Sequence, residues 1–143
     1  MQNDQLTYEM LLAALTEVIK ASLADGLAPV CIVLSDAQGE LVALQRSPGA
    51  PGRAVNIAIA KAYTAARMGV STVAFKQRLL SQQYVLQDFM DSGLTSLAGG
   101  LPIKSEGVVV AAVGISGRSP EQDAELAEVF LSLLASESGA PSA

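Results

Sequence analysis

The side chain best suited to chemistry is Lys61, which lies in the alanine-rich segment AVNIAIAKAYTAARM, residues 54–68. Thr64 is three positions away and falls on the same side of a helix, while Tyr63 falls on an adjacent face. A lysine surrounded by alanines can bind an anion, or act as a base or an imine former if burial lowers its pKa. The alternative is a structural lysine that pairs with a carboxylate such as Asp123.

Two glycine corners could bring backbone N–H groups to the same end of a predicted hairpin. Gly99-Gly100 precedes one strand and Ser116-Gly117 follows the next, and in an antiparallel pair these points lie at one end. A helix that begins after Ser119 adds unpaired N–H groups, which can hold a carboxylate or a phosphate. Alternatively, the glycines only form turns, and a capping box between Ser119 and Gln122 already satisfies the helix end.

Charged residues are distributed unevenly along the chain. Residues 41–87 contain no Asp or Glu but six Lys or Arg residues. We assign Arg46, Arg53 and Lys61 to a pocket for an anionic metabolite, and the other cations to contacts with the acidic last helix. Asp123 favours the dipole of that helix, and with Tyr63 it is also a candidate proton donor.

The composition excludes several classes of site and partner. The chain has 143 residues, no histidine and a single cysteine, so Ser-His and Cys-His dyads and His-ligated zinc or haem iron are excluded, and we expect no metal site. A net charge of −5 argues against a nucleic-acid partner. Apolar residues make up 50% but aromatics only 4%, which favours a homo-oligomer. Without a membrane-length apolar run or a signal-peptide pattern, we expect a cytoplasmic protein and no membrane partner.

Hydrophobic periodicity and turn signals predict the elements that position these residues. A helix follows Thr7 and ends at Asp25-Gly26, and in the next hairpin Asp36 is interpreted as a turn residue rather than a general acid. The full order is helix, hairpin (29–46), helix (54–68), helix (71–80), ordered loop (81–96), hairpin (101–116) and a last helix after Ser119. This predicts an α+β fold with an antiparallel sheet between helices. We expect one domain over residues 1–135 and a polar tail over 136–143.

The motifs together resemble the GlcG/HbpS family of haem-degrading or haem-binding-like domains, and a module attached to some cobalamin adenosyltransferases. The resemblance spans roughly residues 5–135 and rests on SDAQGELVALQR with Asp36 and Gly39, KAYTA from Lys61, GGLPI from Gly99, GISG from Gly114, and Gln122-Asp123. It implies a profilin-like fold with a five-stranded antiparallel sheet flanked by helices, usually in symmetric oligomers. In some members it implies binding of haem, a corrinoid or a small organic molecule.

Two departures from the family pattern bear on the ligand. Relatives commonly read Arg-Met-Asp-Gly-Ala where this chain has Arg46-Ser47-Pro48-Gly49-Ala50, so the acid is missing. No histidine is present to ligate iron, which disfavours haem or a corrinoid as cofactor.

The leading hypothesis is a binding protein for an anionic organic ligand, a small carboxylate or a tetrapyrrole, held between the Lys61 helix and the two glycine corners. The predicted ligand-binding residues are Arg46, Arg53, Lys61, Thr64, Gly99, Gly100, Ser116, Gly117 and Gln122. The alternative is an isomerase, hydrolase or lyase acting on a small metabolite with backbone amides as an oxyanion site, for which Lys61, Tyr63 and Asp123 are the predicted catalytic residues. A third hypothesis is haem binding or sensing without histidine ligation.

Overall fold

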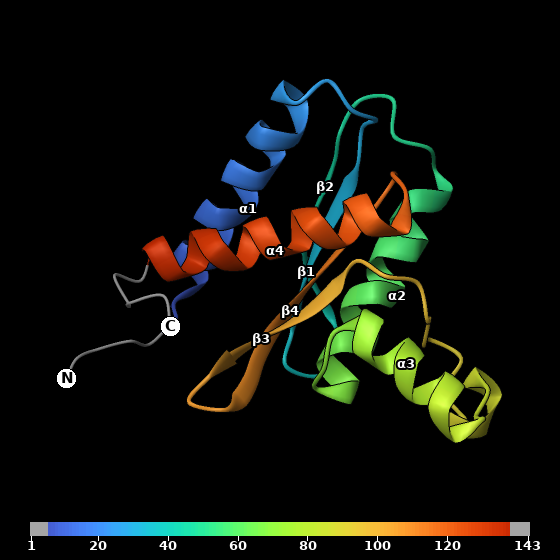
Figure 1. The fold of residues 1–143 in the computed structure, drawn as a ribbon. Coiled ribbons are helices and arrows are strands. Elements are labelled where there is room, and N and C mark those ends of the chain that lie inside the picture. Colours follow the sequence, from blue (N-terminus) through green and yellow to red (C-terminus); the bar gives the residue numbers. More distant parts are fainter. Residues whose placement is uncertain (1–5, 138–143) are drawn as a thin grey trace.

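A computed structural model describes residues 6–137, in which helices and hairpins alternate in the predicted order (Figure 1). The elements are α1 (Tyr8–Ala24), β1 (Cys31–Asp36), β2 (Leu41–Arg46), α2 (Arg53–Met68), α3 (Thr72–Gln82), the 3-10 helix η1 (Leu86–Phe89), β3 (Gly100–Ser105), β4 (Val108–Ser116) and α4 (Pro120–Glu137). The helices α1 and α3 are capped at their starts, since the Thr7 and Ser71 side chains each accept a hydrogen bond from the first turn of their helices.

The two hairpins form one antiparallel sheet with the strand order β2-β1-β4-β3. The central strands β1 and β4 pair so that Cys31 lies opposite Ser116. The first hairpin closes through the predicted turn, in which the Asp36 carboxylate accepts hydrogen bonds from two backbone N–H groups and Gly39 adopts a φ of 92°. The interpretation of Asp36 as a turn residue is therefore confirmed.

The sheet has four strands within residues 6–137, not the five that the resemblance implies. The stretch between α3 and β3 provides no further strand, because it contains η1 and left-handed backbone at Gln83 (φ 59°) and Met90 (φ 55°). A left-handed residue turns the chain and interrupts extended pairing. The α+β class is confirmed, and the prediction of five strands is wrong.

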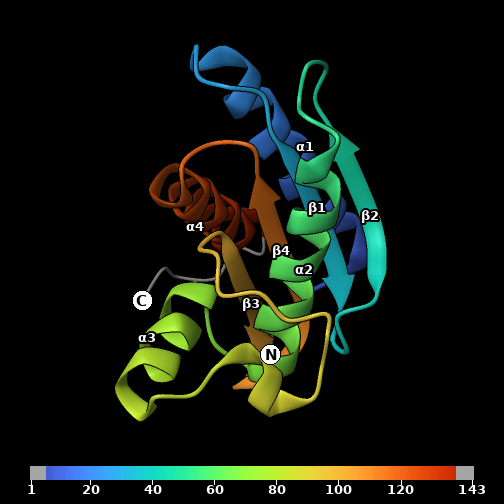
Figure 2. The same ribbon diagram turned by 90° about the vertical axis from the view of Figure 1, so that its right-hand side faces the viewer.

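Helices cover both faces of the sheet, with α1 and α4 on one face and α2 on the other (Figures 1 and 2). The first face holds the larger apolar core, which includes Val18 of α1 and Phe130 of α4. On the second face, α2 packs against β1 and β4 through a stripe of small residues, Ala54, Ala58, Ala62 and Ala65. Small side chains let a helix axis lie close to the sheet, and this closeness brings Lys61 to the backbone of β4.

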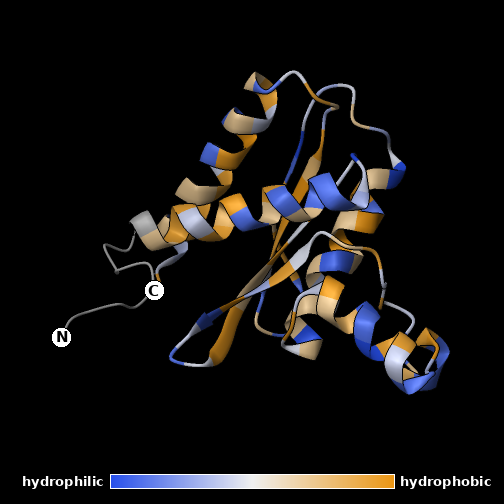
Figure 3. Cartoon of the chain, viewed as in Figure 1, coloured by the Kyte–Doolittle hydropathy of each residue, from blue (hydrophilic) through white to orange (hydrophobic). Residues whose placement is uncertain are grey.

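Hydropathy follows this layering, since β1 and β4 are largely hydrophobic and hydrophilic residues gather at the start of α4 (Figure 3). Within residues 6–137, no helix has both the length and the hydropathy to cross a bilayer. The last helix continues to Glu137, two residues beyond the predicted domain end, and the rest of the predicted tail, 138–143, lies outside the described residues. The homo-oligomer and the cytoplasmic location stay predictions.

Candidate functional site

Lys61 is almost fully buried, at 2% exposure, and its amine lies where β4 passes into α4. Its Nζ donates hydrogen bonds to the Ile115 carbonyl (2.7 Å) and to the Asp123 carboxylate (2.9 Å). The two charged side chains, each 3% exposed, form a buried ion pair. The pairing with Asp123 that the sequence suggested as a structural alternative is thus present, and it places both residues at one point.

Burial shifts the two members of this pair in opposite directions. Desolvation lowers the pKa of Lys61 and raises the pKa of Asp123, and in each case the hydrogen bond between them opposes the shift. Both shifts reduce the free energy needed to move a proton from the amine to the carboxyl group. The pair can therefore supply a neutral amine beside a neutral acid, which is the form in which lysine acts as a nucleophile or base.

A cavity of about 170 Å³ adjoins the pair, between the start of α2 and the β4–α4 corner. Five of the predicted site residues line it: Arg53, Lys61, Ser116, Gly117 and Asp123. The other lining residues are Pro51, Ala54, Ile57, Leu97, Arg118 and Pro120. Most of these are apolar, so the polar groups stand in a largely apolar enclosure.

Two donors in this cavity have no protein partner. Ser116 is 5% exposed, and within residues 6–137 neither its hydroxyl nor the Arg53 guanidinium forms a hydrogen bond or an ion pair. The helix α2 also begins here without a side-chain cap, since Gly52 occupies its N-cap position. Both groups are reached by solvent, because the Ser47 hydroxyl is the one buried side-chain polar atom without a partner within residues 6–137 and Arg53 is exposed. Each can therefore donate to an acceptor from outside the chain.

The two glycine corners border different cavities. Gly117 lines the cavity beside Lys61, whereas Gly99 and Gly100 line a second cavity of about 190 Å³ with residues of α3 and α4. Gly99 nevertheless backs the ion pair, because a Cβ there would lie 2.8 Å from Lys61 Nζ and 2.6 Å from the Ile115 carbonyl oxygen. Its lack of a side chain is therefore required by the buried amine.

Tyr63 and Thr64 do not line the Lys61 cavity. The Tyr63 hydroxyl donates to both oxygens of Asp91 at 2.9 Å. The Thr64 hydroxyl donates to the Ala60 carbonyl and accepts from the backbone N–H of Thr95. These bonds connect α2 to the segment before β3.

Arg46 and Gln122 also have structural partners. The Arg46 guanidinium donates two hydrogen bonds to the Ala50 carbonyl and closes the proline-glycine loop. The Gln122 side chain accepts from the backbone N–H of Ser119, and the Ser119 hydroxyl accepts from that of Gln122. The predicted capping box is confirmed, so neither side chain is directed to a ligand.

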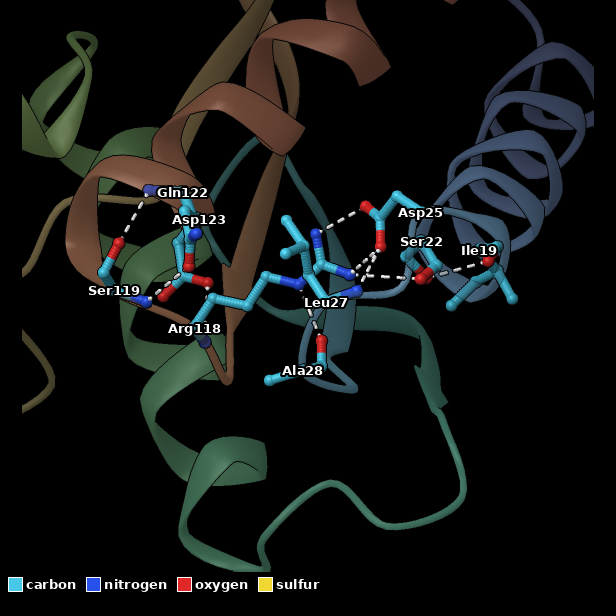
Figure 4. A network of polar contacts seen from close by, with 9 residues as sticks. All are labelled: Ile19, Ser22, Asp25, Leu27, Ala28, Arg118, Ser119, Gln122 and Asp123. Carbon is cyan, nitrogen blue, oxygen red and sulfur yellow. Dashed lines mark hydrogen bonds and ion pairs between the residues drawn. The ribbon is translucent and has the colours of Figure 1, made fainter.

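Arg118 is a site residue that the sequence reasoning missed (Figure 4). Its side chain, 2% exposed, crosses to the end of α1 and donates to Asp25 (2.7 and 2.8 Å) and to the carbonyls of Ala28 (2.6 Å) and Ser22 (3.0 Å). Its backbone N–H donates to the second carboxylate oxygen of Asp123 (3.1 Å). The backbone N–H of Arg118 thus fixes the Asp123 carboxylate, which in turn accepts the hydrogen bond from Lys61 Nζ.

Replacing Arg118 by glutamine should lower the free energy of unfolding by about 1.5–3 kcal/mol, because the partly buried Ser22 carbonyl and the Ala28 carbonyl lose a charged donor. Arg53→Gln is the matched control and should change it little, because this exposed arginine has no partner within residues 6–137. Urea unfolding measures both variants. Equal losses in the two variants would contradict the role of Arg118.

The loss of stability in Arg118→Gln should also depend on pH. Hydrogen bonding to Arg118 lowers the pKa of Asp25, so the stability from this contact is present above the usual aspartate pKa and is lost as the pH falls through the lowered one. The deficit of Arg118→Gln should therefore shrink in acid.

A larger hollow, of about 560 Å³, lies at η1 but is formed by a single segment, residues 86–94. The one carboxylate that lines it, Asp91, already accepts from Tyr63. It gathers no functional groups from distant parts of the chain. We therefore place the candidate site at Lys61.

Several known proteins are similar to this chain in sequence. Residues 6–132 match the family model described as haem degrading protein HbpS-like. The chain is 32% identical, over 92% of its length and 96% of the relative's, to an uncharacterized 15.0 kDa protein from the dhaT-dhaS intergenic region of Citrobacter freundii. It is 31% identical to the corrinoid adenosyltransferase PduO of the same organism, over 74% of this chain but only 32% of PduO.

Two solved structures superpose over nearly the whole chain. A double mutant of HbpS from Streptomyces reticuli gives a TM-score of 0.81 at 29% identity, covering 94% of this chain and 90% of HbpS. The haem complex of PduOC gives 0.78 at 24% identity, covering 90% and 94%, and this likeness supports the fold alone. Since the family model covers all four strands and most of the last helix, the chain belongs to the HbpS-like family.

Proposed function

We propose that the protein binds a small anionic organic molecule in the cavity beside Lys61. The observation that carries this proposal is the convergence of a buried amine, a solvent-reached hydroxyl without a protein partner and an unpaired guanidinium on one cavity of about 170 Å³. Membership of the HbpS-like family favours a small-molecule-binding role.

The charges at the cavity favour an anion. Lys61 is paired with Asp123, and Arg118 with Asp25, so these two cations are already balanced. Arg53 has no carboxylate partner within residues 6–137. The uncapped start of α2 adds a partial positive charge at the same place. Arg53 is thus the cation of the cavity lining that no carboxylate balances within residues 6–137, and a carboxylate ligand would balance its charge.

The size of the cavity favours a small carboxylate over a tetrapyrrole. Pockets for drug-sized ligands measure about 300–1,000 Å³, whereas this cavity measures about 170 Å³. An engineered cavity of about 150 Å³ holds benzene, which has six carbon atoms. The expected ligand therefore has a similar number of non-hydrogen atoms.

Small carboxylates should raise the thermal unfolding temperature in a saturable way, because a ligand that binds only the folded chain stabilises it by about 2.7 kcal/mol at a hundred times its Kd. Differential scanning fluorimetry with acetate, glycolate, pyruvate and succinate measures this. Arg53→Gln should weaken the effect, while Lys76→Gln, which removes a charge from the exposed side of α3 outside the cavity, should not.

Haemin provides the opposing test. If haemin binds with a sharp Soret band and stabilises the protein while none of the four acids does, the proposed ligand class is wrong. If the acids act no better than sodium chloride at equal ionic strength, there is no specific carboxylate site.

A further inference from the structure

The amine of Lys61 is placed to react as well as to bind. It lies at the wall of the cavity, and the Lys61 side chain is only 3% exposed, so little water reaches its stem. Both acceptors that hold Nζ are fixed: the Ile115 carbonyl is part of β4, and the Asp123 carboxylate is held by the Arg118 N–H. The amine is therefore presented in one orientation, beside a group that can exchange a proton with it.

A second feature selects the reacting molecule. The Ser116 hydroxyl and the Arg53 guanidinium line the same cavity and have no partner within residues 6–137. A carboxylate would satisfy both donors. A carbonyl carbon next to that carboxylate would then be the part of the molecule closest to the amine in a cavity of this size. A 2-oxo acid of three or four carbons has both groups.

We propose that Lys61 condenses with a small 2-oxo acid to form an imine, an inference that rests on the proposed binding function. The Nζ lone pair attacks the carbonyl carbon and the C–N bond forms. Asp123 takes a proton from the nitrogen and gives one to the carbonyl oxygen. Asp123 then gives a proton to the resulting hydroxyl group, which leaves as water as the C–O bond breaks and the C=N bond forms, and Asp123 takes the remaining proton from the nitrogen. No oxidant or reductant takes part, and the net change is amine plus carbonyl to imine plus water.

The directions of the pKa shifts of Lys61 and Asp123 agree with this chemistry. Burial lowers the pKa of Lys61 and raises the pKa of Asp123, so the neutral amine and the neutral acid that the reaction needs are both favoured relative to their forms in water. After condensation, the neutral imine nitrogen has no hydrogen to donate, but it can accept a hydrogen bond from the protonated Asp123 carboxyl group that now faces it.

Reductive trapping tests the proposal directly. The protein is incubated with pyruvate and sodium cyanoborohydride, which supplies the hydride that converts an imine to a stable secondary amine, and the modified residue is located by peptide mass mapping. We expect one adduct per chain, at Lys61. Lys61→Arg, which keeps a cation beside Asp123, should lose it, whereas Lys76→Arg, on the exposed side of α3, should keep it.

Comparison with acetaldehyde, which has no carboxylate, tests the selection by Arg53. Because aldehydes condense with amines faster than ketones, the test is the ratio of the two rates: the pyruvate-to-acetaldehyde ratio should be higher for the wild-type protein than for Arg53→Gln. Arg53→Gln should reduce the pyruvate rate roughly two- to fivefold, the effect expected of an exposed ion pair, and leave the acetaldehyde rate unchanged.

The outcomes separate this inference from the binding function. If pyruvate stabilises the wild-type protein but the map shows no adduct at Lys61, imine formation is excluded and the binding site stands. If none of the four acids stabilises the protein and pyruvate is not trapped, both proposals fail. Modification spread equally over the surface lysines also overturns imine formation at this site, and the wild-type map gives this answer even if Lys61→Arg does not fold.

Discussion

Lys61→Met should lower the free energy of unfolding by about 3–5 kcal/mol, the usual effect of removing one member of a buried ion pair. The methionine fills a similar volume, so packing changes little. The loss comes from Asp123, which stays at 2% exposure without its cation. Urea unfolding near neutral pH measures the change.

The double variant Lys61→Met/Asp123→Asn separates charge from packing. Asparagine keeps an acceptor for the Arg118 N–H but carries no charge, so most of the lost stability should return. If the double variant is no more stable than Lys61→Met, the loss is due to packing and the ion pair is not its cause.

The pH dependence of Lys61→Met has a definite sign. Burial already raises the pKa of Asp123, and the hydrogen bond from Lys61 is the main effect that opposes this rise. Without the lysine, the pKa of the folded state rises further above that of the unfolded chain. A raised carboxyl pKa favours folding at low pH, and this advantage is lost as the pH rises through the raised value. The deficit of the variant should therefore be smaller near pH 5 than near pH 8.

Features encoded by short sequence patterns were predictable. The Asp36–Gly39 turn and the capping box of α4 depend on residues within four positions of one another, and the structure confirms both. The prediction of five strands was wrong because it came from the resemblance, and nothing in the sequence pattern revealed the left-handed backbone at Gln83 and Met90.

Contacts between distant residues could be predicted only in part. Asp123 was named as a carboxylate with which Lys61 could pair, as the structural alternative to a ligand-binding role, and the structure contains this pair. Arg118 was missed because its partner Asp25 is 93 positions away and no local pattern joins them. Tyr63 was grouped with Lys61 although it is two positions away, a spacing that places side chains on different faces of a helix.

Gly114→Ala should also lower the free energy of unfolding by about 3 kcal/mol or more. This loss is at or above the upper end of the usual cost of overpacking a core. A Cβ at this position would collide with the carbonyl oxygen of Ala58 and would lie 2.6 Å from the backbone nitrogen of Ala62. Both atoms belong to the α2 backbone, so no side chain can rotate to make room. The helix as a whole must move away from β4.

The effect of Gly114→Ala should reach the site, because the same Cβ would lie 3.1 Å from the Cβ of Lys61. Moving α2 outward increases the distance between Lys61 and Asp123. Pyruvate should therefore no longer stabilise the variant, even under conditions in which the variant is folded. Gly52→Ala is the matched control: this residue has helical backbone (φ −58°, ψ −35°) and open space around it, so alanine should stabilise by about 0.4–1 kcal/mol. A Gly114→Ala protein that unfolds like the wild type and still responds to pyruvate would show that the close packing of α2 on β4 does not position the amine.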